Sequence, residues 1–188
     1  MRRILFLGLY AFMASNSSYA SYDDLLEHIS SHRKDSGHRV LIAGCGKTDE
    51  LNSIAAFLGE NGKVFAYDKS EEYVKYCQKH VQPDARIQVS KMQAEKPPKF
   101  FKNGVVQNLY GSFDLVHCNI NLRKMKQNFS LLAIYQMYLL LKPGGTFSCR
   151  QEDQELVAVT WNVLSAVEER GFNLNHETVV CSKAVIEG

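Results

Sequence analysis

The chain has 188 residues, of which 45% are hydrophobic and 22% charged, the composition of one globular domain with its own core. Its formal net charge of +2 includes Arg2 and Arg3, so the chain without its first twenty residues would be formally neutral. Overall charge therefore gives no reason to expect nucleic-acid binding.

The first twenty residues have the three parts of a secretory signal peptide. Two arginines precede an apolar run from Ile4 to Met13, and a serine-rich stretch ends at Ala20. The run is shorter than the about 20 residues that cross a bilayer, so we expect no stable membrane span. We expect residues 1–20 to be a signal peptide, residues 21–188 to form a single domain, and the protein to be exported, either secreted or periplasmic.

The five cysteines favour a cytoplasmic location over export. They are odd in number, have no CxxC spacing and mostly lie in apolar runs, which argues against a zinc site or a disulfide framework. Cysteine used as a small core residue fits a reducing compartment. A cytoplasmic location is therefore the alternative to export, and no metal site is expected.

Strand and helix patterns alternate along the rest of the chain. After a short amphipathic helix over 22–32, we expect strands over 39–43, 63–67, 85–90, 113–118 and 146–149 and one or two strands within 173–186. Helices are expected over 48–58, 71–80, 129–141 and 153–170. Residues 91–112 are irregular, because Pro97-Pro98 excludes a helix or a central strand. This alternation predicts an α/β fold, a doubly wound, mostly parallel sheet with helices on both faces.

The most informative motif joins the first two strands. In Arg39-Val-Leu-Ile-Ala-Gly-Cys-Gly-Lys47, glycines 44 and 46 allow a sharp turn and a close approach to a ligand at the start of the next helix. Asp68 ends the second strand about 20 residues further on, where a carboxylate can accept hydrogen bonds from both hydroxyls of a ribose. Together they predict an adenosine-type ligand.

Two other nucleotide-binding motifs do not fit this turn. The G-x-G-x-x-G pattern of nicotinamide dehydrogenases needs a third glycine where Asp49 stands, which argues against hydride transfer. A Walker loop that ends in Gly46-Lys47-Thr48 needs its first glycine where Leu41 stands. We therefore treat Gly46-Lys47-Thr48 as a coincidence.

The glycine turn, Asp68, Gly111-Ser-Phe-Asp-Leu-Val116 and Leu139-Leu-Leu-Lys-Pro-Gly-Gly-Thr-Phe147 together resemble the class I S-adenosylmethionine-dependent methyltransferases, which have a Rossmann-like fold. The resemblance covers the chain from about Asp35 onward. It implies a methyltransferase with S-adenosylmethionine as cofactor. The residues that the resemblance assigns to the cofactor are Gly44, Gly46, Asp68, Gln93 and Asn119.

The resemblance also gives each of these residues a role. The glycine loop would hold the methionine part and lie under the ribose, and Asp68 would bind the ribose hydroxyls. Gln93 stands where the family usually places an acid that binds the adenine amino group. Its side-chain carbonyl can accept the same bond without the charge. Asn119 stands where the family often contacts the amino-acid end of the cofactor.

The glycine motif is degenerate at two positions. Ala43 replaces an acid that supports the loop and the cofactor's ammonium group, and Thr48 replaces a later glycine. Lys47 would repel a sulfonium cation if the two were close, unless it points to solvent. Two hypotheses stay open: a methyltransferase that acts on a small molecule or a protein, and a catalytically degenerate member of the fold that serves as a binding or interaction module.

Catalytic residues are not assigned by the sequence. His117 lies inside an apolar strand, where a packed core residue is more common than a general base. Asn121 and Arg123 are better placed to line the pocket. The Asn/Asp-Pro-Pro-aromatic motif of nucleobase and glutamine methyltransferases is absent after the fourth strand. We expect a small-molecule or protein methyl acceptor and no nucleic acid.

Overall fold

The computed structural model describes residues 37–81, 84–102, 104–168, 172–175 and 180–183. The expected signal peptide over residues 1–20 and the helix expected over 22–32 lie outside the described residues.

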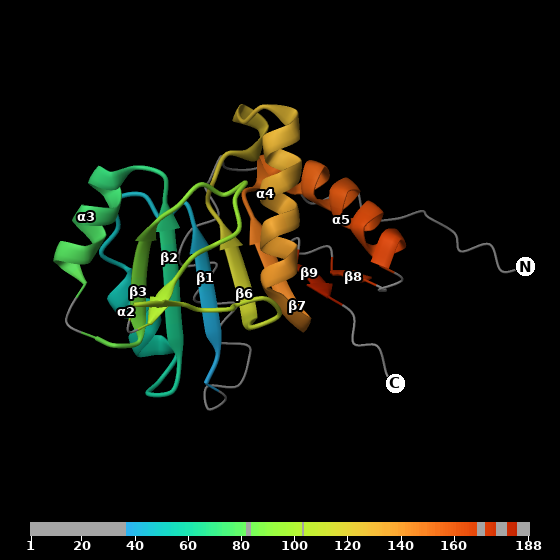
Figure 1. Cartoon of the computed structure of the whole chain (residues 1–188). Helices are drawn as coiled ribbons and strands as arrows, with labels where there is room; N and C mark the ends of the chain where they lie inside the picture. Colours follow the sequence, from blue (N-terminus) through green and yellow to red (C-terminus); the bar gives the residue numbers. More distant parts are fainter. Residues whose placement is uncertain (1–36, 82–83, 103, 169–171, 176–179, 184–188) are drawn as a thin grey trace, which may run out of the picture.

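A seven-stranded sheet forms the centre of the structure, in the order β3-β2-β1-β6-β7-β9-β8 (Figure 1). Its strands are β1 (Arg39–Ala43), β2 (Lys63–Asp68), β3 (Ile87–Lys91), β6 (Phe113–Cys118), β7 (Leu141–Cys149), β8 (Phe172–Asn175) and β9 (Val180–Lys183). The first five pair in parallel, whereas β9 is antiparallel to both β7 and β8. The predicted doubly wound, mostly parallel sheet is confirmed.

Helices cover both faces of this sheet. They are α2 (Leu51–Phe57), α3 (Glu71–His80), α4 (Gln127–Leu140) and α5 (Gln154–Glu168), with the short 3₁₀ helices η1 (Leu122–Lys124) and η2 (Gln151–Asp153). Side chains alternate along β1, so Val40 and Ile42 pack with α2 while Leu41 and Ala43 face the core under α4. The sheet therefore separates two apolar cores.

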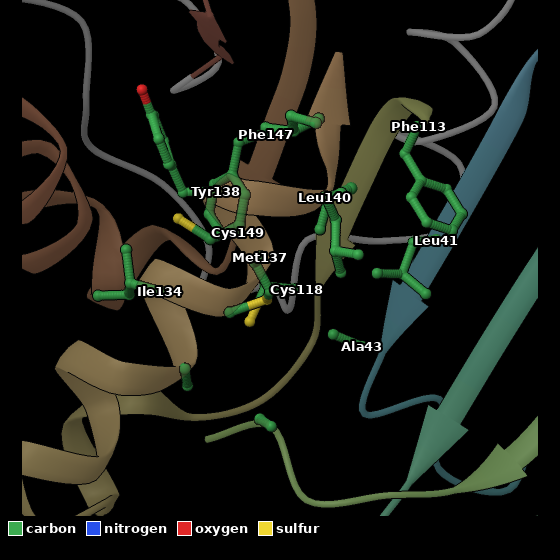
Figure 2. Close-up of a cluster of buried hydrophobic side chains, with 14 of the residues drawn as sticks. Leu41, Ala43, Phe113, Cys118, Ile134, Met137, Tyr138, Leu140, Phe147 and Cys149 are labelled. Carbon is green, nitrogen blue, oxygen red and sulfur yellow. The ribbon is translucent and has the colours of Figure 1, made fainter. Parts of the chain in front are cut away.

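The larger core lies between the sheet and α4 (Figure 2). The centroid of the Trp161 ring of α5 lies 5.0 Å from those of the Tyr138 and Phe147 rings, and Trp161 is fully buried. Phe100 packs edge-on against Phe65 of β2, with 5.0 Å between the ring centroids. This contact fixes the irregular segment against the sheet.

Two segments differ from the sequence prediction. Strand β7 begins at Leu141 instead of 146, and Lys142-Pro-Gly-Gly145 forms a bulge within it. Phe113 of β6 pairs with Leu141 but Leu115 pairs with Thr146, and Gly144 has a positive φ of 75°. Within the segment expected to be irregular, β4 (Phe101–Lys102) pairs with β5 (Val105–Val106) in a small antiparallel hairpin. Both strands of this hairpin are too short to leave a pattern in the sequence.

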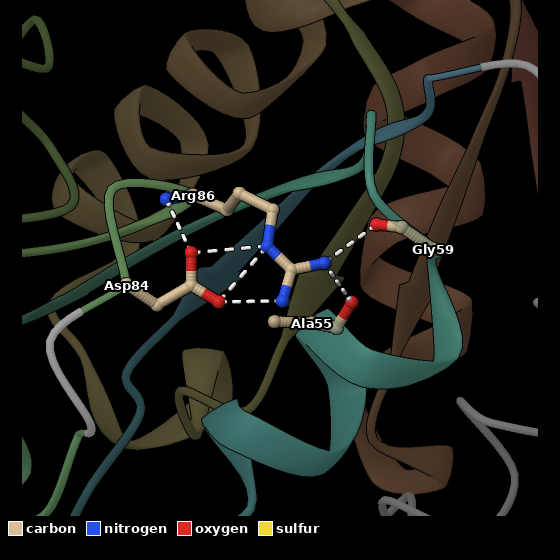
Figure 3. A network of polar contacts seen from close by, with 4 residues as sticks. All are labelled: Ala55, Gly59, Asp84 and Arg86. Atoms are coloured by element: carbon tan, nitrogen blue, oxygen red, sulfur yellow. Dashed lines mark hydrogen bonds and ion pairs between the residues drawn. The ribbon is translucent and has the colours of Figure 1, made fainter.

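Arg86 fastens the end of α2 to the start of β3 (Figure 3). One nitrogen of its guanidinium donates to the carbonyls of Ala55 (3.1 Å) and Gly59 (2.6 Å) at the end of the helix. The other two nitrogens bind both carboxylate oxygens of Asp84. The planar guanidinium thus binds one carbonyl of the last helical turn and one just beyond the helix.

Replacing Arg86 with lysine should lower the free energy of unfolding by about 1–3 kcal/mol, because one ammonium cannot replace this fork of hydrogen bonds. Urea denaturation at pH 7 measures the change. Arg123→Lys is the matched control: Arg123 is half exposed, its guanidinium pairs with Glu155, and the change should stay below about 0.5 kcal/mol. Equal stabilities of the Arg86→Lys and control variants would contradict the anchoring role.

Candidate functional site

The carboxyl ends of the parallel strands bring the residues of the glycine turn together with more distant positions. Ala43, at the end of β1, is in register with Tyr67 of β2 on one side and with Cys118 of β6 on the other. The next residues along each strand, Gly44, Asp68 and Asn119, therefore meet at one edge of the sheet. In open α/β sheets this edge is where ligands bind.

The two glycines of the turn serve different purposes. Both have a positive φ, 74° at Gly44 and 63° at Gly46. A Cβ atom added to Gly44 would lie 2.6 Å from Cγ1 of Ile120, so this glycine is needed for packing. A Cβ atom added to Gly46 would meet no described atom within 4 Å, so this glycine faces open space. The backbone at Gly46 is accessible to a ligand.

Backbone hydrogen bonds hold the turn over the end of β2. The amides of Gly44 and Cys45 both donate to the carbonyl of Tyr67, at 2.8 and 3.0 Å. The Gly46 amide donates to Oδ2 of Asp68 (3.0 Å), and the Ser70 amide donates to Oδ1 (2.8 Å). Each carboxylate oxygen keeps a further lone pair. Asp68 therefore supports the loop and retains acceptors for a ligand.

Asn119 places a hydrogen-bond acceptor, its side-chain oxygen, at the same edge, and this oxygen has no donor among the described residues. The backbone amide of Asn119 donates to the carbonyl of Ala43 (2.9 Å), which fixes the residue beside the glycine turn. Its side-chain oxygen Oδ1 is buried, and no group among the described residues donates a hydrogen bond to it. A buried acceptor without a donor costs free energy, which a ligand that carries N–H groups would recover.

Gln93 lies two residues beyond β3 in a turn closed by the bond from the Lys96 amide to its carbonyl (3.1 Å). Ala94 is buried and anchors this turn, while Gln93 is exposed. The Met92 amide donates to the carbonyl of Asp68 (3.0 Å), so the turn follows directly beside the end of β2. Gln93 thus borders the same edge as the glycine turn.

The residues that depart from the family motif have other partners. The half-exposed Lys47 pairs with Glu72 of α3 (2.5 Å), and the hydrogen bond with Glu72 raises its pKa above the ordinary value. Ala43 is fully buried among apolar side chains. The hydroxyl of Thr48 accepts a bond from the Glu50 amide (3.1 Å), and α2 starts only at Leu51. The charge of Lys47 is therefore balanced at α3.

His117 is a packed residue of β6. It is 1% exposed, and its Nδ1 lies 2.7 Å from Oγ of Ser148 on the neighbouring strand. The interpretation of His117 as a core residue is the one the structure favours.

Asp153 is a site residue that sequence reasoning missed. Its carboxylate is fully buried and accepts bonds from the amides of Leu122 (3.1 Å) and Arg123 (3.0 Å). It therefore holds η1 in place after Asn119. On the outer side, Asn121 donates to Glu152 (2.9 Å). No sequence spacing links Asp153 to η1, because 30 residues separate it from Arg123.

The opposite edge of the sheet holds a separate polar cluster around Asp114. Its carboxylate accepts bonds from the Arg39 amide and from Lys142, each at 2.8 Å. Burial acts to raise the pKa of Asp114, but these bonds outweigh it, so the pKa lies below its ordinary value. A cavity of about 130 Å³ opens beside this cluster, at the amino ends of β1 and β6.

Two further features bear on what the described residues can do. Among them, no three histidine, cysteine or acidic side chains come together in a way that could hold a metal ion. None of the described helices combines the length and the apolar character needed to cross a bilayer.

Residues 34–184 match the sequence profile of a family described as a methyltransferase domain. The chain belongs to this methyltransferase family. It is 29% identical over 118 residues to a demethylmenaquinone methyltransferase of Lysinibacillus sphaericus (strain C3-41), a match that covers 63% of the chain and 46% of the relative. The match thus spans about half the length of this curated relative.

Solved structures show the same fold. A SAM-dependent methyltransferase from Aquifex aeolicus superposes with a TM-score of 0.59 at 17% identity, over 87% of the chain and 89% of that protein. A putative S-adenosyl-L-methionine-dependent methyltransferase from Methanococcus maripaludis gives a TM-score of 0.56 at 16% identity, over 89% and 86%. The predicted class I methyltransferase fold is confirmed.

Alanine substitutions should separate the roles of the two glycines. Gly44→Ala forces a methyl group into Ile120 at a positive φ and should lower the free energy of unfolding by about 2–4 kcal/mol. Gly46→Ala meets only the φ penalty, about 1–2 kcal/mol. Urea denaturation of both variants measures the difference. A Gly46→Ala variant less stable than Gly44→Ala would contradict the open space seen beside Gly46.

Proposed function

We propose that the chain is a class I methyltransferase that binds S-adenosylmethionine at the carboxyl edge of the sheet and transfers its methyl group to a small-molecule or protein acceptor. The observation that carries the proposal is the side-chain oxygen Oδ1 of Asn119, which is buried next to the glycine turn and accepts no hydrogen bond from the described residues. This oxygen suits an ammonium group, which has three N–H donors and no acceptor. Membership of the methyltransferase family supports the same cofactor.

The residues at this edge fit the rest of the cofactor. The remaining lone pairs of Asp68 would accept from the two ribose hydroxyls. The open side of Gly46 lets the backbone come close to the ligand, and the exposed Gln93 would accept from the adenine amino group. When bound, S-adenosylmethionine supplies an activated methyl group on its sulfonium.

The protein's part in the reaction is to hold both reactants in line. Methyl transfer is a displacement that gains most of its rate from positioning, so it requires no universal base. Asp153 holds η1 beside Asn119 through the amides of Leu122 and Arg123, and the side chains of Asn121 and Arg123 are bonded to Glu152 and Glu155. His117 is enclosed and bonded to Ser148, which removes it from the candidates for a base.

The acceptor is a small molecule or a protein in this proposal. The relative from Lysinibacillus sphaericus is named for the small molecule demethylmenaquinone. Small molecules are therefore the first class to screen, with purified full-length protein and radiolabelled cofactor.

Calorimetric titration of the full-length protein tests the proposed cofactor. S-adenosylmethionine and S-adenosylhomocysteine should bind with micromolar affinity, and NAD should not bind. Asp68→Ala should weaken both ligands about tenfold or more, because it removes the acceptors for the ribose and the support of the Gly46 amide. No binding of either ligand at millimolar concentration would contradict the proposal and favour a degenerate binding protein.

Asn119→Ala tests the undonated oxygen directly. It removes a side-chain oxygen that has no described donor, so the free energy of unfolding without ligand should fall by less than about 1 kcal/mol. Cofactor affinity should nevertheless fall about tenfold, measured by the same titration. Asn108→Ala is the control, because Asn108 is exposed and its oxygen accepts from the nearby Tyr110 amide. A large loss of stability with unchanged affinity would assign Asn119 a structural role only.

A further inference from the structure

Two cysteines meet beneath the glycine turn. Cys45 stands between the two glycines, and Cys77 lies in the second half of α3. Neither cysteine is in a disulfide, both side chains are buried, and a hydrogen bond joins the two side chains. The two residues are 32 positions apart in the sequence, so no spacing motif reveals the pair.

Cys77 also holds the backbone of the turn. Its thiol lies 3.2 Å from the carbonyl of Gly46 and 3.5 Å from that of Thr48. Together with the contact to Cys45, these interactions connect α3 to three positions of the turn. Any change in the chemistry of Cys77 therefore acts on the part of the backbone that faces the cofactor edge.

The thiol contact favours reaction at Cys77. The hydrogen bond from Cys45 lowers the pKa of Cys77 below the ordinary value against the opposing effect of burial, while the pKa of Cys45 is raised. Cys77 is therefore the sulfur of the pair that deprotonates first and attacks an oxidant. Both side chains are buried, so an oxidant reaches them when the turn opens locally.

The other described cysteine pair is different. Cys118 and Cys149 are in register on β6 and β7, inside the core under α4 (Figure 2). Burial raises the pKa of Cys118 to about 12, so it supplies little thiolate near neutral pH. Oxidation should therefore select Cys45 and Cys77.

We propose that Cys45 and Cys77 form a redox-sensitive pair whose disulfide displaces the glycine turn and lowers affinity for the cofactor, and whose reduction restores it. The regulatory part rests on the proposed cofactor site. A disulfide brings two sulfurs to about 2.05 Å, closer than any hydrogen-bonded pair of thiols. A disulfide sulfur carries no proton, so Cys77 could no longer donate to the carbonyls of Gly46 and Thr48, and the turn would lose this link to α3.

The oxidant in the proposal is a peroxide. The Cys77 thiolate attacks one peroxide oxygen, the O–O bond breaks, and a sulfenic acid and hydroxide form; the hydroxide takes the proton that Cys77 released and becomes water. The Cys45 sulfur then attacks the Cys77 sulfur, the S–S bond forms, the S–O bond breaks, and the leaving oxygen takes the Cys45 proton and departs as a second water. The peroxide gains the two electrons that the thiols lose. A dithiol reverses the step and becomes a disulfide itself.

Mass spectrometry and calorimetry on one sample test the proposal. The reduced full-length protein is treated with hydrogen peroxide, its remaining thiols are alkylated, and it is digested with trypsin. We expect the peptide of residues 40–47, VLIAGCGK, linked to the peptide of residues 76–79, YCQK. Affinity for S-adenosylhomocysteine should fall about tenfold or more on oxidation and recover with dithiothreitol.

Variants assign the response to the pair. Cys77→Ala and Cys45→Ser should lose the effect of peroxide on affinity, whereas Cys149→Ser should keep it. Affinity measured on the protein without substitutions, after oxidation and again after reduction, tests the redox effect even if a substitution unfolds the domain.

Three outcomes would overturn the proposal in whole or in part. Absence of the linked peptides while other cysteines become oxidised would refute the pair. Linked peptides with unchanged affinity would refute its effect on the cofactor site. The third outcome is that peroxide produces the linked peptides but the protein binds no S-adenosylhomocysteine even before oxidation. That result would overturn the cofactor assignment and the regulatory part, and would establish the disulfide site alone.

Discussion

The hydrogen bond from the Gly46 amide to the Asp68 carboxylate is the constraint on which the candidate site depends. With the bonds from Gly44 and Cys45 to the Tyr67 carbonyl, it bends the turn back over the end of β2. That bend requires positive φ angles, which glycine adopts without strain. It also sets the orientation of Asp68, leaves one side of Gly46 open and places the sulfur of Cys45 against α3.

The parallel sheet brings the remaining groups to this turn. Its register aligns the ends of β1, β2 and β6, so Asn119 reaches the turn from a strand about 75 residues later. Apolar side chains fill both faces of the sheet, while Arg86 and Asp114 secure positions away from the carboxyl edge. The groups that hold the fold together are therefore largely distinct from those proposed to hold the ligand.

Features that depend on neighbours in the chain could be predicted from the sequence. The strands β1 and β6 and the start of α3 at its Ser70 cap match the prediction, because side-chain alternation and capping are local signals. Strand β7 starts earlier than expected, since Leu141 already pairs with β6 ahead of the bulge that Lys142-Pro-Gly-Gly145 forms. Contacts between distant residues, such as Asp153 with η1 and Cys77 with the glycine turn, leave no trace in spacing or composition.

A crystal structure of the full-length protein with S-adenosylhomocysteine would show whether Asp68 and Asn119 hold the cofactor. We expect ligand density at the carboxyl edge, with the ribose hydroxyls within hydrogen-bond distance of Asp68 and the ammonium group on Oδ1 of Asn119. The bond between the Gly46 amide and Asp68 should persist in this complex. Ligand bound instead in the cavity beside Asp114, or at the carboxyl edge without contact to Asp68 and Asn119, would contradict it.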